Sequence, residues 1–171
     1  MLPEQLFPES ADSEGAKPME KFRVLTKGIV RHNDKYLVVE RWYDDRIFDP
    51  YQWEFINGYV NFGETPEIAL KRSILEQTGL SVEVTKTLYT WGFTAGEVCS
   101  SGIAFLCDAV SDNVRLSEDL HDSKWIDKDE ILTTLSNKNV VEDIKNSGFI
   151  EDFAIDDFGE IDLFIDPVKE D

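Results

Sequence analysis

Hydrophobic and polar residues alternate along the first part of the chain in the pattern of β-strands. The runs 22–30 (FRVLTKGIV) and 35–42 (KYLVVERW) are rich in β-branched and aromatic residues, and a turn-forming sequence at 32–34 (HND) separates them. We therefore predict a β-hairpin. The polar and aromatic stretch 43–52 predicts a surface loop, and the run 53–56 (WEFI) predicts a short strand that follows it.

The segment 65–79 has both the periodicity and the end residues of an α-helix. Thr65 is a preferred N-cap residue, Pro66 suits the first helical position, and Gly79 suits the position just beyond the last turn. Apolar residues occupy two sides of this helix, Ile68 with Leu75 and Leu70 with Ile74. We therefore expect the helix to pack on both sides, between two layers.

The rest of the chain contains further strand and helix patterns. We predict strands at 81–91, 101–110 and 124–126, a loop at 92–100, and helices at 127–135 and 139–145. The final segment, 149–171, alternates acidic residues with Phe and Ile and predicts a solvated acidic tail. The opening segment, 1–20, is acidic and rich in helix-breaking residues. It predicts a disordered N-terminal arm that is not a secretory signal.

Composition restricts the class of protein. The chain has 171 residues, of which 42% are hydrophobic, so it is long enough to bury a core as one domain. No apolar run approaches the roughly 18 residues that a membrane-spanning helix needs. The formal net charge of -18 disfavours binding to nucleic acid or to anionic membranes. The two cysteines, Cys99 and Cys107, lack the spacing of a zinc site, which favours a reduced, cytoplasmic protein.

The stretch 58–80 resembles the Nudix box, the sequence motif of the Nudix hydrolases. The residues that match the motif are Gly58, Glu64, Arg72, Ile74, Glu76, Gly79 and Leu80. Ser73 and Gln77 depart from it, because they stand where the family has glutamates. The resemblance covers roughly residues 21–135 and implies an α/β fold, a Nudix-like α/β/α sandwich with a mixed β-sheet. We therefore expect a Nudix-like domain at 21–148 between the acidic arm and the acidic tail.

The resemblance also implies a metal-dependent reaction. In the family, glutamates of the box bind Mg²⁺ or Mn²⁺, and the metal neutralises phosphate charge and activates water. Carried over to this chain, the motif implies Glu76 and Glu64 as metal ligands, Glu76 and Arg72 as the catalytic pair, and Gly58 in the substrate loop. Arg72 would orient the acids through ion pairs. The leading hypothesis is a pyrophosphohydrolase that cleaves a diphosphate linkage in a nucleoside diphosphate derivative.

The substitutions at Ser73 and Gln77 support an alternative. A hydroxyl and an amide are weaker magnesium ligands than carboxylates, and loss of a general base lowers rates by about 10²–10⁴. The alternative is a catalytically inactive Nudix fold that binds a nucleotide-like ligand or a protein partner. An isomerase acting on a diphosphate ester is a third hypothesis. We expect the loops at 43–52 and 93–99 to select the substrate, and a homodimer is a reasonable expectation.

Overall fold

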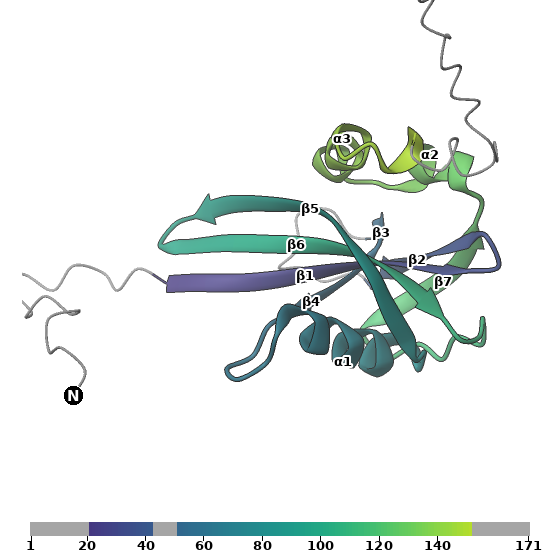
Figure 1. Cartoon of the computed structure of the whole chain (residues 1–171), viewed down its shortest axis with the longest axis horizontal. Helices are drawn as coiled ribbons and strands as arrows, with labels where there is room; N and C mark the ends of the chain where they lie inside the picture. Colours follow the sequence, from purple (N-terminus) through teal and green to yellow (C-terminus); the bar gives the residue numbers. More distant parts are fainter. Residues whose placement is uncertain (1–20, 43–50, 152–171) are drawn as a thin grey trace, which may run out of the picture.

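The computed structural model describes residues 21–42 and 51–151 (Figure 1). The predicted N-terminal arm, nearly all of the predicted loop at 43–52, and the predicted tail from residue 152 onward lie outside the described residues. None of the helices in the described ranges is long and apolar enough to cross a membrane. The described part of the chain is built around one mixed β-sheet.

Strands from distant parts of the chain meet in this sheet. They are β1 (Lys21–His32), β2 (Lys35–Arg41), β3 (Trp53–Glu54), β4 (Ile56–Tyr59), β5 (Val82–Ala95), β6 (Val98–Ala109) and β7 (Leu120–Ile126). The main order is β3-β2-β1-β6-β5, while β4 pairs with β1 and β7 pairs with β2. The β1 and β6 strands are parallel, and every other described pair is antiparallel. The sheet is therefore mixed, as predicted.

Helices cover both faces of the sheet (Figure 1). They are α1 (Pro66–Thr78), the 3₁₀ turn η1 (Lys128–Glu130), α2 (Ile131–Thr134) and α3 (Lys138–Asn146). Helix α1 lies on one face, and α2 and α3 lie on the other. This arrangement confirms the predicted α/β/α sandwich.

The first hairpin follows the predicted turn chemistry. Strands β1 and β2 join through Asn33 and Asp34, whose φ angles of 47° and 61° lie in the left-handed region. Asn and Asp tolerate this region better than other non-glycine residues, and two successive left-handed residues match the twist of a hairpin. The pairing of His32 with Lys35 fixes the register.

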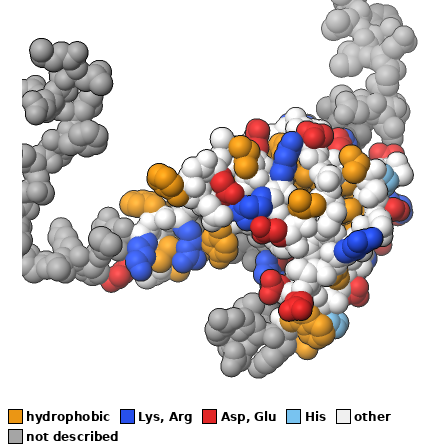
Figure 2. Space-filling model, turned by 90° about the horizontal axis from the view of Figure 1, so that it is seen from below, with side chains coloured by type: hydrophobic (Ala, Val, Ile, Leu, Met, Phe, Trp, Pro, Cys, Tyr) orange, Lys and Arg blue, Asp and Glu red, His pale blue; other side chains and the backbone are white. Residues whose placement is uncertain are grey.

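Helix α1 has the predicted ends but packs on one side only. The Thr65 hydroxyl accepts a hydrogen bond from the Ile68 N–H, and Gly79 closes the helix with a φ of 70°. However, Ile68 is 56% exposed and Leu75 is 53% exposed, so the expectation of packing on two sides was wrong. Figure 2 views this side of the molecule, where hydrophobic side chains are scattered among charged ones. The sheet occupies the opposite side of α1, and no second layer covers its outer side within the described residues.

Two hydrophobic clusters lie on opposite faces of the sheet, because successive strand residues point to opposite faces. Val30 belongs to the cluster under α1, whereas Ile29 belongs to the cluster under α2 and α3. Phe149 is 1% exposed and completes the second cluster against Tyr36. Phe149, the first residue of the predicted tail at 149–171, is therefore part of the packed domain.

The predicted loop at 92–100 is instead part of a long hairpin. Strand β5 continues to Ala95, a tight turn occupies Gly96 and Glu97, and β6 begins at Val98. Ala95 pairs with Val98, so the ladder reaches the turn itself. The hairpin and the start of β1 extend to one side of the domain (Figure 1). The glycines and small polar residues that suggested a loop are accommodated because this end of the hairpin is solvent-exposed.

Candidate functional site

The box region begins where α1 rests directly on strand β4. A Cβ atom placed on Gly58 would come within 2.1 Å of the Ser73 Oγ and 2.6 Å of its Cβ, so only glycine fits at this position. The Ser73 side chain is correspondingly buried, with the residue 4% exposed. The Gly58 backbone on β4 therefore packs directly against the Ser73 side chain on α1.

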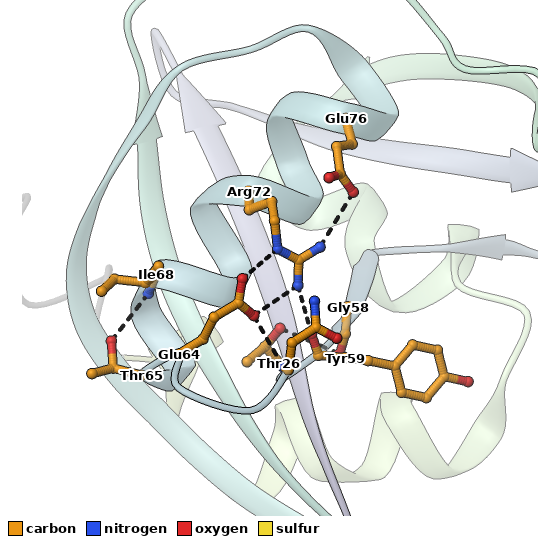
Figure 3. Close-up of polar contacts among 9 residues, drawn as sticks. Thr26, Gly58, Tyr59, Glu64, Thr65, Ile68, Arg72 and Glu76 are labelled. Carbon is orange, nitrogen blue, oxygen red and sulfur yellow. Dashed lines mark hydrogen bonds and ion pairs between the residues drawn. The ribbon is translucent and has the colours of Figure 1, made fainter.

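Arg72 is the centre of the polar network of the box (Figure 3). Its Nε and Nη2 donate to the two carboxylate oxygens of Glu64 at 2.6 and 2.9 Å, which makes a bidentate ion pair. Nη2 also donates to the Tyr59 carbonyl at 2.9 Å, and Nη1 donates to Glu76 at 3.2 Å. The Asn61 N–H donates to the same Glu64 carboxylate at 3.0 Å. One arginine therefore joins the end of β4, the connecting loop and the helix.

The network also sets the charge of Glu64. Hydrogen bonds from Arg72 and from the Asn61 N–H hold the pKa of Glu64 below its ordinary value of 4.5. Because the folded-state pKa is depressed, the pairing stabilises the fold above pH 4.5, and this contribution is lost as the pH falls through the lowered pKa. Both oxygens of Glu64 are engaged by donors from its own chain.

We expect the Glu64→Gln variant to lose less stability on acidification than the wild type. The variant has no carboxylate to protonate at this position, so the wild type should show the steeper loss of unfolding free energy below pH 4.5. Urea unfolding at a series of pH values from 6 to 3 measures this slope. Equal slopes for the two proteins would show that the Glu64 pair contributes no pH-dependent stability.

The two departures from the box motif make specific contacts of their own. Gln77 donates its side-chain amide to the Asn57 carbonyl at 2.8 Å, which ties α1 to β4. The reverse orientation of this amide would point one oxygen at another, so the donor role is chemically required. Ser73 lies against Gly58 and is covered by it. Neither side chain offers a carboxylate to a metal ion.

The box contains the two carboxylates that the motif implies as magnesium ligands, those of Glu64 and Glu76. Magnesium prefers oxygen ligands in octahedral geometry and is usually bound by one or two carboxylates. Glu64 is held by Arg72 and Asn61, while Glu76 is paired with Arg72 and its side chain is largely exposed. The structure therefore brings the two predicted ligands, Glu64 and Glu76, together around an arginine.

Within the described residues, one group of three acids could supply closely spaced metal ligands, and it lies elsewhere. It consists of Asp127, Asp129 and Glu130, all exposed, around the 3₁₀ turn after β7. Asp127 and Glu130 form the predicted capping box there, and Asp127 also pairs with Lys35 at 2.6 Å. These contacts show that Asp127 and Glu130 cap the start of the 3₁₀ turn, which explains why the acids lie close together.

A cavity of about 790 Å³ opens on the other side of the sheet from α1. Residues from strands β1 to β5, from α3 and from its N-cap line it, among them Lys27, Asn57, Trp91, Phe93, Asn137 and Asp143. Gly58 and Tyr59 also line it, so the cavity reaches the start of the box. Aromatic side chains share the wall with charged and amide groups, which offer ring surfaces and hydrogen-bonding groups to a small molecule.

Sequence reasoning missed the main polar residue of this cavity. Lys27 lies within the run 22–30, which predicted a strand of the hairpin but gave no role to its lysine. Its position opposite Asn57 follows from the β1–β4 register, which the sequence alone does not show. Trp91 was predicted within a strand and contributes to the cavity wall.

The fold is shared with solved protein structures of low sequence identity. A MutT protein from Methanosarcina mazei Go1 superposes with a TM-score of 0.62 at 21% identity, covering 82% of this chain and 99% of that one. An ADP-ribose pyrophosphatase from Streptococcus suis 89-1591 superposes with a TM-score of 0.56 at 17% identity, covering 77% and 91%. At these identities the likeness concerns the fold.

Sequence comparison assigns the family. The profile of the NUDIX domain matches residues 23–144, and the chain belongs to the Nudix hydrolase family. The nucleoside triphosphatase NudI of Enterobacter sp. (strain 638) is 27% identical over 123 residues, which cover 65% of this chain and 86% of that protein. The NAD-capped RNA hydrolase NudC of Haemophilus influenzae (strain PittEE) is 32% identical over 81 residues, 46% of this chain and 29% of NudC.

Proposed function

We propose that this Nudix protein binds a nucleoside diphosphate derivative in the cavity, and that direct protein contacts in the box replace a divalent metal. The observation that carries the proposal is the 2.8 Å hydrogen bond from the Gln77 amide to the Asn57 carbonyl. The Gln77 amide occupies the Asn57 carbonyl oxygen, which could otherwise bind a cation. The hydrogen bond therefore joins β4 to α1 without an ion. This favours the binding hypothesis over the metal-dependent hydrolase.

The composition of the cavity supports a nucleotide-like ligand. Trp53, Trp91 and Phe93 offer ring surfaces to a planar group, and Asn137 and Asn139 offer amide donors and acceptors. The names of the relatives refer to nucleoside triphosphates, NAD-capped RNA and ADP-ribose, all of which combine a planar base with phosphates. These names support the ligand class for this chain.

A specific observation keeps the metal-dependent hydrolase as the second candidate. The Glu64–Arg72–Glu76 arrangement holds the loop and the helix in a defined geometry, with the Glu76 carboxylate exposed at the surface. The Glu76 side chain is 63% exposed, against 19% for that of Glu64. A hydrolase of this kind would depend on Glu76 and on additional acids recruited by the substrate.

The deciding experiment measures binding and turnover on the same ligands. The panel contains nucleotide sugars, dinucleoside polyphosphates, ADP-ribose and nucleoside triphosphates, each tested with EDTA, Mg²⁺ or Mn²⁺. We expect calorimetry to detect binding in EDTA with an affinity that metal leaves unchanged, and we expect no turnover. The Glu76→Gln variant should bind equally well, because Glu76 does not line the cavity.

Two results would contradict the binding proposal. The first is turnover that requires Mg²⁺ or Mn²⁺ and disappears in the Glu76→Gln variant, which would identify a hydrolase working with a reduced set of carboxylates. The second is ligand binding that occurs only with metal. Folded wild-type protein that binds no member of the panel would exclude both nucleotide hypotheses and leave a protein partner as the ligand.

A further inference from the structure

Lys27 is a charged residue in a buried position. The residue is 6% exposed, lies at the centre of β1 and lines the cavity. Within residues 21–42 and 51–151, no acceptor makes a hydrogen bond or an ion pair with its ammonium group. The close neighbour of Nζ is the indole of Trp91, whose ring centroid lies 4.6 Å away. A cation–π contact of this kind holds an ammonium in place but leaves its N–H donors free.

A buried ammonium group without a hydrogen-bond acceptor is costly. Burial lowers the pKa of Lys27, and the carboxylates of Glu54 and Asp143 offset this only in part. An apolar side chain at this position would avoid the desolvation penalty. Buried cations that lack a partner within the protein are typical of sites where a ligand supplies the opposite charge.

We propose that Lys27 binds a phosphate group of the ligand and supplies the positive charge that the box does not take from a metal ion. This inference rests on the proposed function, since it assigns one group of the same ligand to one residue of the same cavity. The ammonium offers three donors, and a phosphate oxygen accepts charge-assisted hydrogen bonds from them.

The strand register places Lys27 where the cavity meets the box. Lys27 is the direct β1 partner of Asn57 on β4, one residue before Gly58. A phosphate on the ammonium would therefore lie beside the start of the substrate loop. The cavity also contains Glu142 and Asp143 on α3, and these acids repel a phosphate. We infer that the ligand points its phosphate toward β1 and its hydroxyl or amino donors toward α3.

Trp91 keeps the ammonium in position because Gly102 leaves room for the indole. A Cβ on Gly102 would come within 2.3 Å of two ring atoms of Trp91, which faces it across the β5–β6 pair. The indole ring of Trp91 therefore packs directly on the backbone of β6 at Gly102. Trp91 is a positioning residue for Lys27.

The test compares Lys27→Met with the wild type on ADP and adenosine, by calorimetry in EDTA. The wild type should bind ADP more tightly than adenosine. The variant should lose about 10- to 100-fold in ADP affinity, the range for a hydrogen bond to a charged group, with adenosine affinity unchanged. Lys71→Met is the matched control, because Lys71 lies on α1, pairs with Glu83 at 2.9 Å and does not line the cavity.

The possible outcomes separate this inference from the proposed function. Unchanged ADP affinity in Lys27→Met, or equal wild-type affinity for ADP and adenosine, would overturn the role of Lys27 and leave the cavity proposal standing. Failure of the wild type to bind either probe would overturn both. Thermal unfolding checks that the variant folds, and removal of the buried charge should keep or raise its Tm. Lys27→Gln, which keeps a polar donor without the charge, provides a second variant with the same expected loss.

Discussion

Replacement of Gly58 by alanine should lower the free energy of unfolding by about 3 kcal/mol, the upper range for overpacking. The added Cβ of residue 58 would lie 2.1 Å from the Ser73 Oγ and 2.6 Å from the Ser73 Cβ. The Ser73 Cβ is bonded to the helix backbone, so it cannot move away unless the helix shifts. Helix α1 and strand β4 would have to separate along their contact. Urea denaturation measures the change, and we expect it as a lower midpoint with an unchanged slope.

Gly63→Ala is the matched control for this prediction. Gly63 also lies in the box region, with a φ of 85°, but nothing lies within 4 Å of a Cβ placed there. Its replacement costs only the strain of a left-handed backbone, about 1–2 kcal/mol. If Gly58→Ala were no more destabilising than Gly63→Ala, the close contact with Ser73 would not constrain the fold.

The Gln77→Glu variant should make the junction between α1 and β4 depend on a divalent cation. In EDTA the new carboxylate would face the Asn57 carbonyl at the site of a 2.8 Å hydrogen bond, and two acceptors would repel each other. We expect a loss of about 1–3 kcal/mol in unfolding free energy. A divalent cation between the two oxygens would relieve the repulsion. Magnesium at ten times its Kd would restore about 1.4 kcal/mol.

Two comparisons make the result specific to the carboxylate. Gln77→Leu also removes the amide donor, so it should be destabilised in EDTA but should not respond to Mg²⁺. The wild type should likewise unfold at the same urea concentration with and without Mg²⁺. A wild type that Mg²⁺ stabilises as strongly as Gln77→Glu would mean that the native box already binds the ion.

Local sequence chemistry was sufficient to predict the elements near the box. The ends of α1 follow from Thr65, Pro66 and Gly79, whose preferences are set by backbone geometry within a few residues. The turn at Asn33 and Asp34 follows in the same way. Both predictions need only the local sequence, because each depends on contacts inside its own segment.

Properties that depend on distant segments could not be predicted in the same way. The exposure of Ile68 and Leu75 depends on whether a second layer covers α1, and periodicity cannot show that. The extension of β5 and β6 to their turn depends on ladder pairing across the hairpin. The role of Lys27 depends on a cavity assembled from β1, β4, β5 and α3. Composition of the local run gives no indication of such a cavity.

The direct contact between Gly58 and Ser73 also couples the two faces of the sheet mechanically. The Ser73 side chain packs directly on the Gly58 backbone, so a displacement of the helix at this point must move the strand with it. Asn57 links the helix to the cavity, because its carbonyl accepts a hydrogen bond from Gln77 on α1 and the residue also lines the cavity. A ligand that pushes on the cavity wall will therefore change the accessibility of α1 amides to hydrogen exchange, although it never touches the helix.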